Sequence, residues 1–172
     1  MNKDTGADEQ PASATGLGPV IGSFPEILVL GSFPSRQSLE KGEYYGNPQN
    51  QFWKIVEALF GIDHRLPYAE RITGLTGAGV ALWDMVHACH REGSADTRIR
   101  DPVHNDIPGL LAVYPSIRLI ALNGRAAEKF WYRQANSPTG VPVVLLPSTS
   151  PAHASCRLED KIRRWDNILT RI

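Results

Sequence analysis

The chain has 172 residues, of which 42% are hydrophobic and 21% are charged, a composition typical of a single globular domain. Its 18 basic and 18 acidic residues cancel, which argues against a protein that bulk positive charge holds on nucleic acid. No apolar run approaches the ~20 residues of a membrane helix, and the first residues lack the basic-then-apolar order of a signal peptide. Two cysteines are too few for a disulfide framework or a four-cysteine cluster. We therefore expect a cytoplasmic protein with no membrane segment and no metal cluster.

The N-terminal part of the chain differs in composition from the rest. Residues 1–24 are rich in Gly, Ala, Ser, Thr and Pro and show no hydrophobic period. Such a segment buries too little apolar surface to offset the entropy lost on ordering. We predict a disordered tail over residues 1–24 and a single domain over residues 25–172.

Apolar runs and helical patterns alternate along the predicted domain. The runs are nearly continuous and end in small or polar residues, as in strands buried on both faces of a parallel sheet. In chain order we predict a strand at 27–32, a helix at 52–60, a strand at 80–84, a helix at 107–113, a strand at 117–124, a helix at 125–132, a strand at 141–148 and a helix at 158–172. This order predicts a three-layer α/β/α sandwich with a central, mainly parallel, four-stranded sheet.

Polar residues stand where the predicted strands end. Ser32, Asp84, Asn123 and Ser148 would all lie at the carboxyl edge of the sheet, where open parallel sheets bind ligands. The long connection GSFPSRQSLEKGEYYGNPQNQFW, residues 31–53, would cover that edge. A connection of this length inside a compact domain is usually functional or disordered, and its aromatic residues argue against disorder.

Four blocks of the sequence carry a family resemblance. The 31–53 loop, ALWDMVHACHREGSADTRI (81–99), LIALNGRAAEKF (119–130) and LLPSTSPAHA (145–154) together resemble the hypoxanthine-DNA glycosylase family, family 6 of the uracil-DNA glycosylase superfamily. The resemblance implies that superfamily's fold and a monofunctional DNA glycosylase that hydrolyses the N-glycosidic bond of hypoxanthine or uracil, the first step of base excision repair. It implies no metal and no cofactor. We expect a monomer that acts on DNA containing a deaminated base, in the cytoplasm at the bacterial nucleoid.

The sequence departs from most of the superfamily at two usual catalytic positions. Phe33 stands where an Asn or Asp usually activates water, and Leu146 replaces the His or Asn before Pro-Ser. The resemblance implies that Asn50, in Pro-x-Asn-x-Phe-Trp, takes over catalysis. An amide can orient water because the sugar is already cationic in the transition state. As an alternative, Asn47 caps a helix with Pro48 at its first position, and Asn50 only closes the first turn.

Four residues form the predicted base-binding set: Phe33, Tyr45, Asp84 and Asn123. The similar loop of mismatch-specific uracil/thymine glycosylases places Tyr45 where a flipped base stacks, although Tyr44 and Tyr45 both packing the loop is the alternative. Asp84 corresponds to an Asn that reads the base in related families. A carboxylate there would accept the ring N–H of hypoxanthine or uracil and reject adenine. There are two alternatives. Asp84 could form a structural ion pair with Arg91 or Arg98, and the Asn123 amide could be satisfied by local hydrogen bonds at the strand end.

Hydroxyl groups gather in the last block. Ser148, Thr149, Ser150 and His153, with Ser32 of the first block, are the predicted DNA contacts. An exposed His153 without a function is the alternative. The Lys and Arg residues of the last predicted helix suit a phosphate-binding strip or a solvated helix face. His87 and Cys89 would share a strand face, but no further ligand has a familiar spacing, so we expect no metal site.

Two other functions fit parts of the pattern. An α/β nucleotide or nucleoside hydrolase would use the same strand-end residues, and a non-catalytic DNA lesion-binding module would keep the pocket without turnover. Dinucleotide-binding and P-loop motifs are absent from the sequence, as is G-x-S-x-G of the serine hydrolases.

Overall fold

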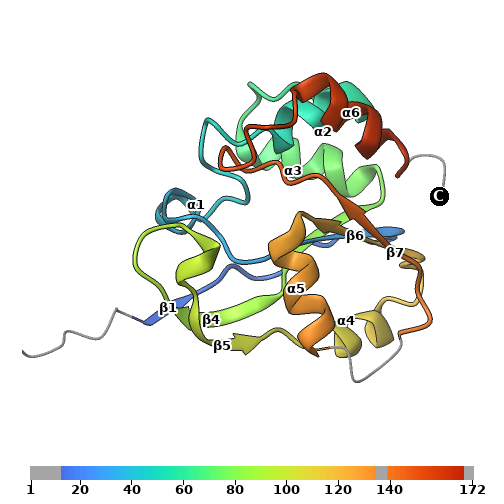
Figure 1. The fold of residues 1–172 in the computed structure, drawn as a ribbon. Helices are drawn as coiled ribbons and strands as arrows, with labels where there is room; N and C mark the ends of the chain where they lie inside the picture. The colour runs from blue at the N-terminus through green and yellow to red at the C-terminus, as the bar shows by residue number, and fades with distance from the viewer. Residues whose placement is uncertain (1–12, 135–138, 169–172) are drawn as a thin grey trace, which may run out of the picture.

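A computed structural model describes residues 13–134 and 139–168 (Figure 1). Its elements in chain order are β1 (Ser13–Thr15), β2 (Ile27–Gly31), α1 (Arg36–Lys41), α2 (Phe52–Phe60), α3 (Tyr68–Gly77), β3 (Val80–Asp84), β4 (Val86–His90), the 3-10 helix η1 (Asp96–Arg98), β5 (Arg100–His104), α4 (Ile107–Val113), β6 (Leu119–Asn123), α5 (Arg125–Gln134), β7 (Val143–Leu146) and α6 (Leu158–Asp166). Across the two described ranges, the search for a helix long and apolar enough to span a membrane finds none.

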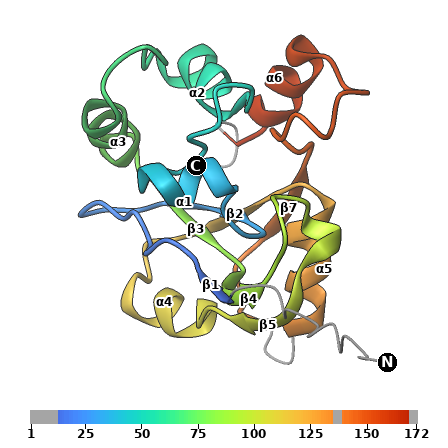
Figure 2. The ribbon, with the colours of Figure 1, turned by 90° about the vertical axis from the view of Figure 1, so that its left-hand side faces the viewer.

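The central sheet has four parallel strands in the order β3-β2-β6-β7. All five residues of β2 are buried, because this strand has a neighbour on each edge and a layer on each face. Ile27 and Val29 pack with α2, α3 and α6, whereas Leu28 and Leu30 pack with α4 and α5. Figures 1 and 2 show these two helical layers on opposite sides of the sheet. The predicted three-layer sandwich and its parallel sheet are confirmed.

A second, antiparallel sheet in the order β1-β4-β5 was not predicted. Register shifts interrupt the pairing of β4 with β5, and β5 contains Pro102 at the sheet edge. The two side chains that we expected on one face of this strand differ in environment, since His87 is exposed and Cys89 is buried. Short irregular strands of this kind leave no regular alternation in the sequence.

The predicted disordered tail is wrong for residues 13–24. Ser13, Ala14 and Thr15 pair with β4 as β1, and Val20 forms two backbone hydrogen bonds with Leu82 at the edge of the central sheet, 2.8 and 2.9 Å long. These contacts use backbone groups, which the composition of a segment does not reveal. Residues 1–12 of the predicted tail lie outside the described residues.

The helices follow the hydrophobic pattern closely. Helix α2 ends at Gly61, whose φ of 70° is the left-handed conformation that glycine adopts without strain. Leu158, Ile162 and Trp165 of α6 pack on the core as predicted, while the predicted continuation through Leu169 and Ile172 lies outside the described residues. Helices α1 and α3 were not predicted.

Candidate active site

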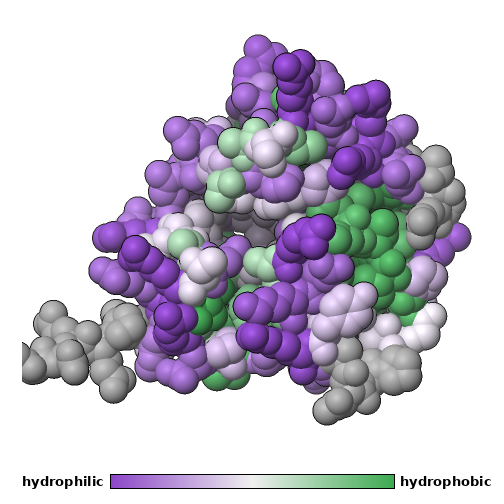
Figure 3. All heavy atoms as spheres, in the orientation of Figure 1, coloured by the Kyte–Doolittle hydropathy of each residue, from purple (hydrophilic) through white to green (hydrophobic). Residues whose placement is uncertain are grey.

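A cavity of about 290 Å³ opens at the carboxyl ends of β2, β3 and β6. Figure 3 shows a hollow near the centre of the face drawn, between α1 and α5 as placed in Figure 1. The cavity brings together every residue that the sequence predicted for the site: Ser32, Phe33, Tyr45, Asn50, Asp84, Asn123, Ser148, Thr149, Ser150 and His153. The first and the last of these residues, Ser32 and His153, are 121 positions apart in the sequence, so the sheet is what brings them together.

Asp84 lies deep in this cavity, at the end of β3. Only 4% of the residue is exposed, and its Oδ2 atom has no hydrogen-bond partner. Gly31 makes room for it, because a Cβ at position 31 would collide with Asp84 Oδ1. Burial, and secondly the charge of Asp96, raise the pKa of Asp84 to about 7, against the opposing attraction of Arg91. The site therefore holds a carboxyl group with an unused oxygen.

The alternative reading of Asp84 as half of an ion pair is not supported. Arg98 lies 3.5 Å from Glu92, and Arg91 donates to the carbonyl of Pro34 with its guanidinium over the Phe33 ring. Among the described residues, no ion pair involves Asp84. Phe33 is buried, lines the cavity, and its ring lies against the Arg91 guanidinium, 4.8 Å from ring centroid to Cζ.

A second carboxylate, Asp96, lines the same cavity and was not predicted. Its Oδ1 accepts a hydrogen bond of 2.7 Å from the Ser32 hydroxyl. Burial raises the pKa of Asp96, while this hydrogen bond and Arg91 lower it. The Ser32 hydroxyl hydrogen is used in this bond and is not free to donate to a phosphate. Ser32 therefore holds the Asp96 loop in place, which does not favour the predicted DNA contact by its hydroxyl. The only sequence signal for Asp96 is its place in the 81–99 block.

The two adjacent tyrosines have different roles. Tyr44 is buried, and its hydroxyl donates to the Gly18 carbonyl at 2.9 Å. Its backbone N–H donates to the Tyr68 hydroxyl, and its backbone carbonyl accepts from the Trp53 indole N–H. Tyr45 takes a left-handed conformation with φ of 55° and turns into the cavity, where its ring stacks on Phe52 with centroids 4.1 Å apart. Burial raises the pKa of Tyr45, so its phenol stays protonated.

Asn123 fixes two sides of the cavity. Its Nδ2 donates to the Tyr45 hydroxyl at 3.1 Å and to Thr149 Oγ1 at 3.0 Å, and its Oδ1 accepts from the Thr149 backbone. Both amide hydrogens are therefore used, which favours the satisfied strand-end amide over a direct base contact. Thr149 is 0% exposed, so its side chain anchors the loop, and the predicted DNA contact by its hydroxyl is wrong.

Asn50 lies at the start of α2. Its Oδ1 accepts a hydrogen bond of 2.9 Å from the Phe52 N–H, while Asn47 Oδ1 accepts from the Gln49 N–H. The helix begins at Phe52, so the predicted cap by Asn47 with Pro48 at the first position is wrong. Asn50 lines the cavity and Asn47 does not. An amide oxygen has two lone pairs, so Asn50 keeps one for a water molecule.

A buried lysine holds the 148–153 loop. Lys161 is 1% exposed, and its Nζ donates to the His153 carbonyl at 3.1 Å. Burial lowers the pKa of this ammonium group. Lys161 therefore positions the loop and is no part of a phosphate-binding strip.

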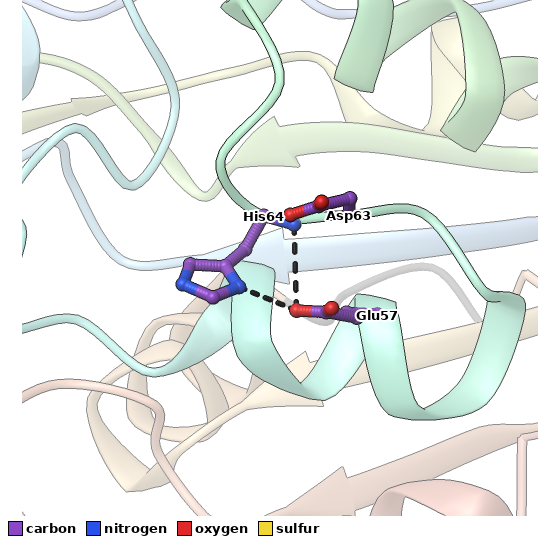
Figure 4. Close-up of side chains that lie close together, drawn as sticks. All are labelled: Glu57, Asp63 and His64. Atoms are coloured by element: carbon purple, nitrogen blue, oxygen red, sulfur yellow. Dashed lines mark hydrogen bonds and ion pairs between the residues drawn. The ribbon is translucent and has the colours of Figure 1, made fainter.

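One group of possible metal ligands occurs within the described ranges, outside this cavity. Glu57 on α2 lies close to Asp63 and His64 in the loop that follows this helix (Figure 4). The His64 ring contacts Glu57, and both Asp63 carboxylate oxygens accept from Arg65, at 2.8 to 3.0 Å. Their carboxylates are thus already engaged by neighbouring side chains.

The family model of the uracil DNA glycosylase superfamily matches residues 20–169. The chain belongs to this superfamily. Superfamily membership makes the protein a DNA glycosylase, a hydrolase of N-glycosyl bonds, so the nucleoside hydrolase and the non-catalytic module are not favoured.

Named relatives support the same assignment. A hypoxanthine DNA glycosylase of Methanosarcina acetivorans is 39% identical over 139 residues, covering 80% of this chain and 87% of the relative. A hypoxanthine DNA glycosylase of Methanosarcina barkeri is 36% identical over 116 residues, covering 67% and 73%. A candidate uracil DNA glycosylase of M. acetivorans, solved by solution NMR, superposes with a TM-score of 0.80 at 34% identity, covering 91% of this chain and 96% of that one.

Two positions set this uracil DNA glycosylase superfamily member apart. Phe33 and Leu146 are buried and apolar, so neither supplies a group that activates water. The carboxylates that line the described cavity are Asp84 and Asp96. The groups that activate water in this glycosylase must therefore come from residues other than those at the two usual positions.

Proposed function

We propose that this DNA glycosylase removes hypoxanthine, and also uracil, from DNA by hydrolysis of the N-glycosidic bond. One observation carries the proposal: Asp84 presents a buried carboxylate oxygen without a partner at the floor of a cavity that has the size for a single base. The names of the two Methanosarcina relatives support hypoxanthine as the substrate.

Base choice follows from the hydrogen-bonding edge of each base. The ionised Asp84 accepts from the N1–H of hypoxanthine or the N3–H of uracil, whereas adenine presents a lone pair at N1 and is repelled. Burial keeps the empty site partly protonated near pH 7. A bound N–H donor favours the charged carboxylate, so binding of a deaminated base itself drives the ionisation of Asp84.

In this proposal the remaining residues surround the flipped nucleotide. Tyr45 offers one ring face to the base, since Phe52 stacks on the other. Asn50 orients the attacking water with its free lone pair. Ser148, Ser150 and His153 line the same cavity and contact the flanking phosphates.

The enzyme is monofunctional and does not cut the strand. Strand cleavage by β-elimination needs an amine that forms a Schiff base with the sugar. Among the described residues that line the cavity, none is a lysine. Residues of one chain line the described cavity, so a monomer is sufficient for activity, and we propose that the enzyme acts as a monomer in the cytoplasm.

The test is a panel of duplex oligonucleotides, each with one hypoxanthine, uracil or xanthine, followed by alkali to cut abasic sites. We expect alkali-dependent strand breaks at hypoxanthine and uracil, and no breaks with adenine at the same position. Retarded but intact DNA would indicate a lesion binder, and turnover of free nucleosides would indicate a nucleoside hydrolase. A covalent adduct trapped with borohydride would contradict monofunctional hydrolysis.

A further inference from the structure

Asp96 and Ser32 form a contact that the proposed roles leave unexplained. Ser32 belongs to the turn after β2, and the superfamily resemblance implies that a water-activating Asn or Asp usually stands one or two positions later in this turn. Asp96 comes from the loop between β4 and β5, 64 positions away in sequence, and accepts the 2.7 Å hydrogen bond from Ser32. The fold thus brings a carboxylate to the turn that lacks one.

The two cavity carboxylates lie at different depths. Asp84 is almost fully buried at a strand end, whereas Asp96 is half-buried on a surface loop. A flipped nucleotide enters with its base first, so the base reaches the deeper carboxylate and the sugar stays nearer the mouth. Asp84 then faces the base, and Asp96 faces the sugar.

We infer that Asp96 is a catalytic residue, which takes a proton from the attacking water and stabilises the cationic sugar, in place of the missing carboxylate or amide of the first motif. This inference rests on the proposed excision of deaminated bases. Asn50 and Asp96 both act on the water molecule. The Asn50 amide orients it, and the Asp96 carboxylate accepts its proton, because an amide is too weak a base to do so.

The step balances without any further reactant. The water oxygen forms a bond to C1′ while the bond between C1′ and the base nitrogen breaks and its electron pair leaves with the base. One water proton passes to Asp96, and the base anion takes a proton from solvent. A negative carboxylate near the sugar also lowers the energy of the oxocarbenium-like transition state.

The charged groups around Asp96 are consistent with this role. Arg91, directly after β4, attracts it, the Ser32 hydroxyl donates to it, and Asp84 at the end of β3 repels it. Arg125 and His153 also line the cavity. Arg91 has Nε and Nη1 without partners, so its charge is not cancelled by a direct ion pair in the described structure.

The test is single-turnover excision of hypoxanthine by Asp96→Asn. Asparagine keeps an oxygen that accepts from Ser32, so the loop stays anchored while the charge and the base function are lost. We expect the excision rate to fall by about a hundredfold or more, as for the loss of a general base. The dissociation constant for hypoxanthine DNA, measured on a non-hydrolysable analogue, should change less than about threefold. If Asp96→Asn does not fold, Asp96→Ser takes its place with the same expectation.

Glu92→Gln is the matched control, because Glu92 is an exposed carboxylate of the same loop outside the cavity. Its excision rate should equal that of the wild type. A wild-type rate in Asp96→Asn, or an equal loss in Glu92→Gln, overturns the inference. Wild-type protein that excises no deaminated base refutes the proposed function instead, so the two failures are distinguishable.

Discussion

The side-chain amide of Asn123 donates a hydrogen bond of 3.1 Å to the hydroxyl of Tyr45. This bond joins the end of β6 to the 31–53 loop and fixes the ring that we propose for base stacking. The phenol therefore has a structural partner, and the ring has a stacking partner in Phe52.

Tyr45→Phe and Tyr45→Ala separate these two contacts. Tyr45→Phe leaves one hydrogen of Asn123 without its acceptor and should lower the free energy of unfolding by about 1–2 kcal/mol. It keeps the ring, so we expect less than about a tenfold loss in excision. Tyr45→Ala also removes stacking worth ~1–3 kcal/mol, and should weaken lesion binding further. Thermal unfolding and binding titrations measure both effects, and equal binding losses would show that the ring does not stack on the base.

Asn50 has a structural and a proposed catalytic contact, which two substitutions separate. Asn50→Ala loses the acceptor for the Phe52 N–H and should cost about 1 kcal/mol of stability, as for a helix cap. It should also lose excision by about a hundredfold or more. Asn50→Asp keeps an oxygen for both contacts and places a negative charge at the helix start, so it should be at least as stable as the wild type.

Single-turnover rates and melting temperatures check this pair. Asn47→Ala is the matched control, because Asn47 makes a similar local bond outside the cavity. Full excision activity in Asn50→Ala would show that another group orients the water.

Hydrophobic periodicity in the sequence was enough to predict the main strands and helices. The parallel strands and helix α2 lie where apolar runs and helical spacing indicated, and the polar residues at the strand ends do meet in one cavity. The contact of Ser32 with Asp96 could not be predicted, because it depends on how an irregular loop folds back across the sheet. Likewise, the burial of Lys161 is invisible in a helix whose other basic residues are exposed or partly exposed.

Asp84 makes stability depend on pH. Its pKa rises from 3.8 to about 7 in the folded protein because of burial. Between these values the folded state keeps a proton that the unfolded state has lost, so stability falls as the pH rises, by at most about 1.4 kcal/mol per pH unit. Asp96, whose pKa is also raised, acts in the same direction.

Asp84→Asn removes this titration. We expect the variant to lose less stability than the wild type as the pH rises from about 5 to about 7, the upper part of the window between the two pKa values of Asp84, as measured by chemical denaturation. On hypoxanthine DNA it should excise more slowly, because a charge-assisted hydrogen bond of about 1.5–3 kcal/mol is lost. If the free energies of unfolding of the two proteins changed equally with pH, Asp84 would already be ionised in the empty site.

The most direct test of the account is to fill the cavity. Ala126 lines it at the start of α5, so Ala126→Trp should occupy the space of the base, whereas Thr73→Trp adds the same side chain to an exposed position on α3, away from the cavity. Single-turnover excision of hypoxanthine from duplex DNA is measured for both folded variants. The account predicts a loss of at least about a hundredfold in Ala126→Trp and a wild-type rate in Thr73→Trp. A wild-type rate in Ala126→Trp would contradict the assignment of this cavity as the lesion site.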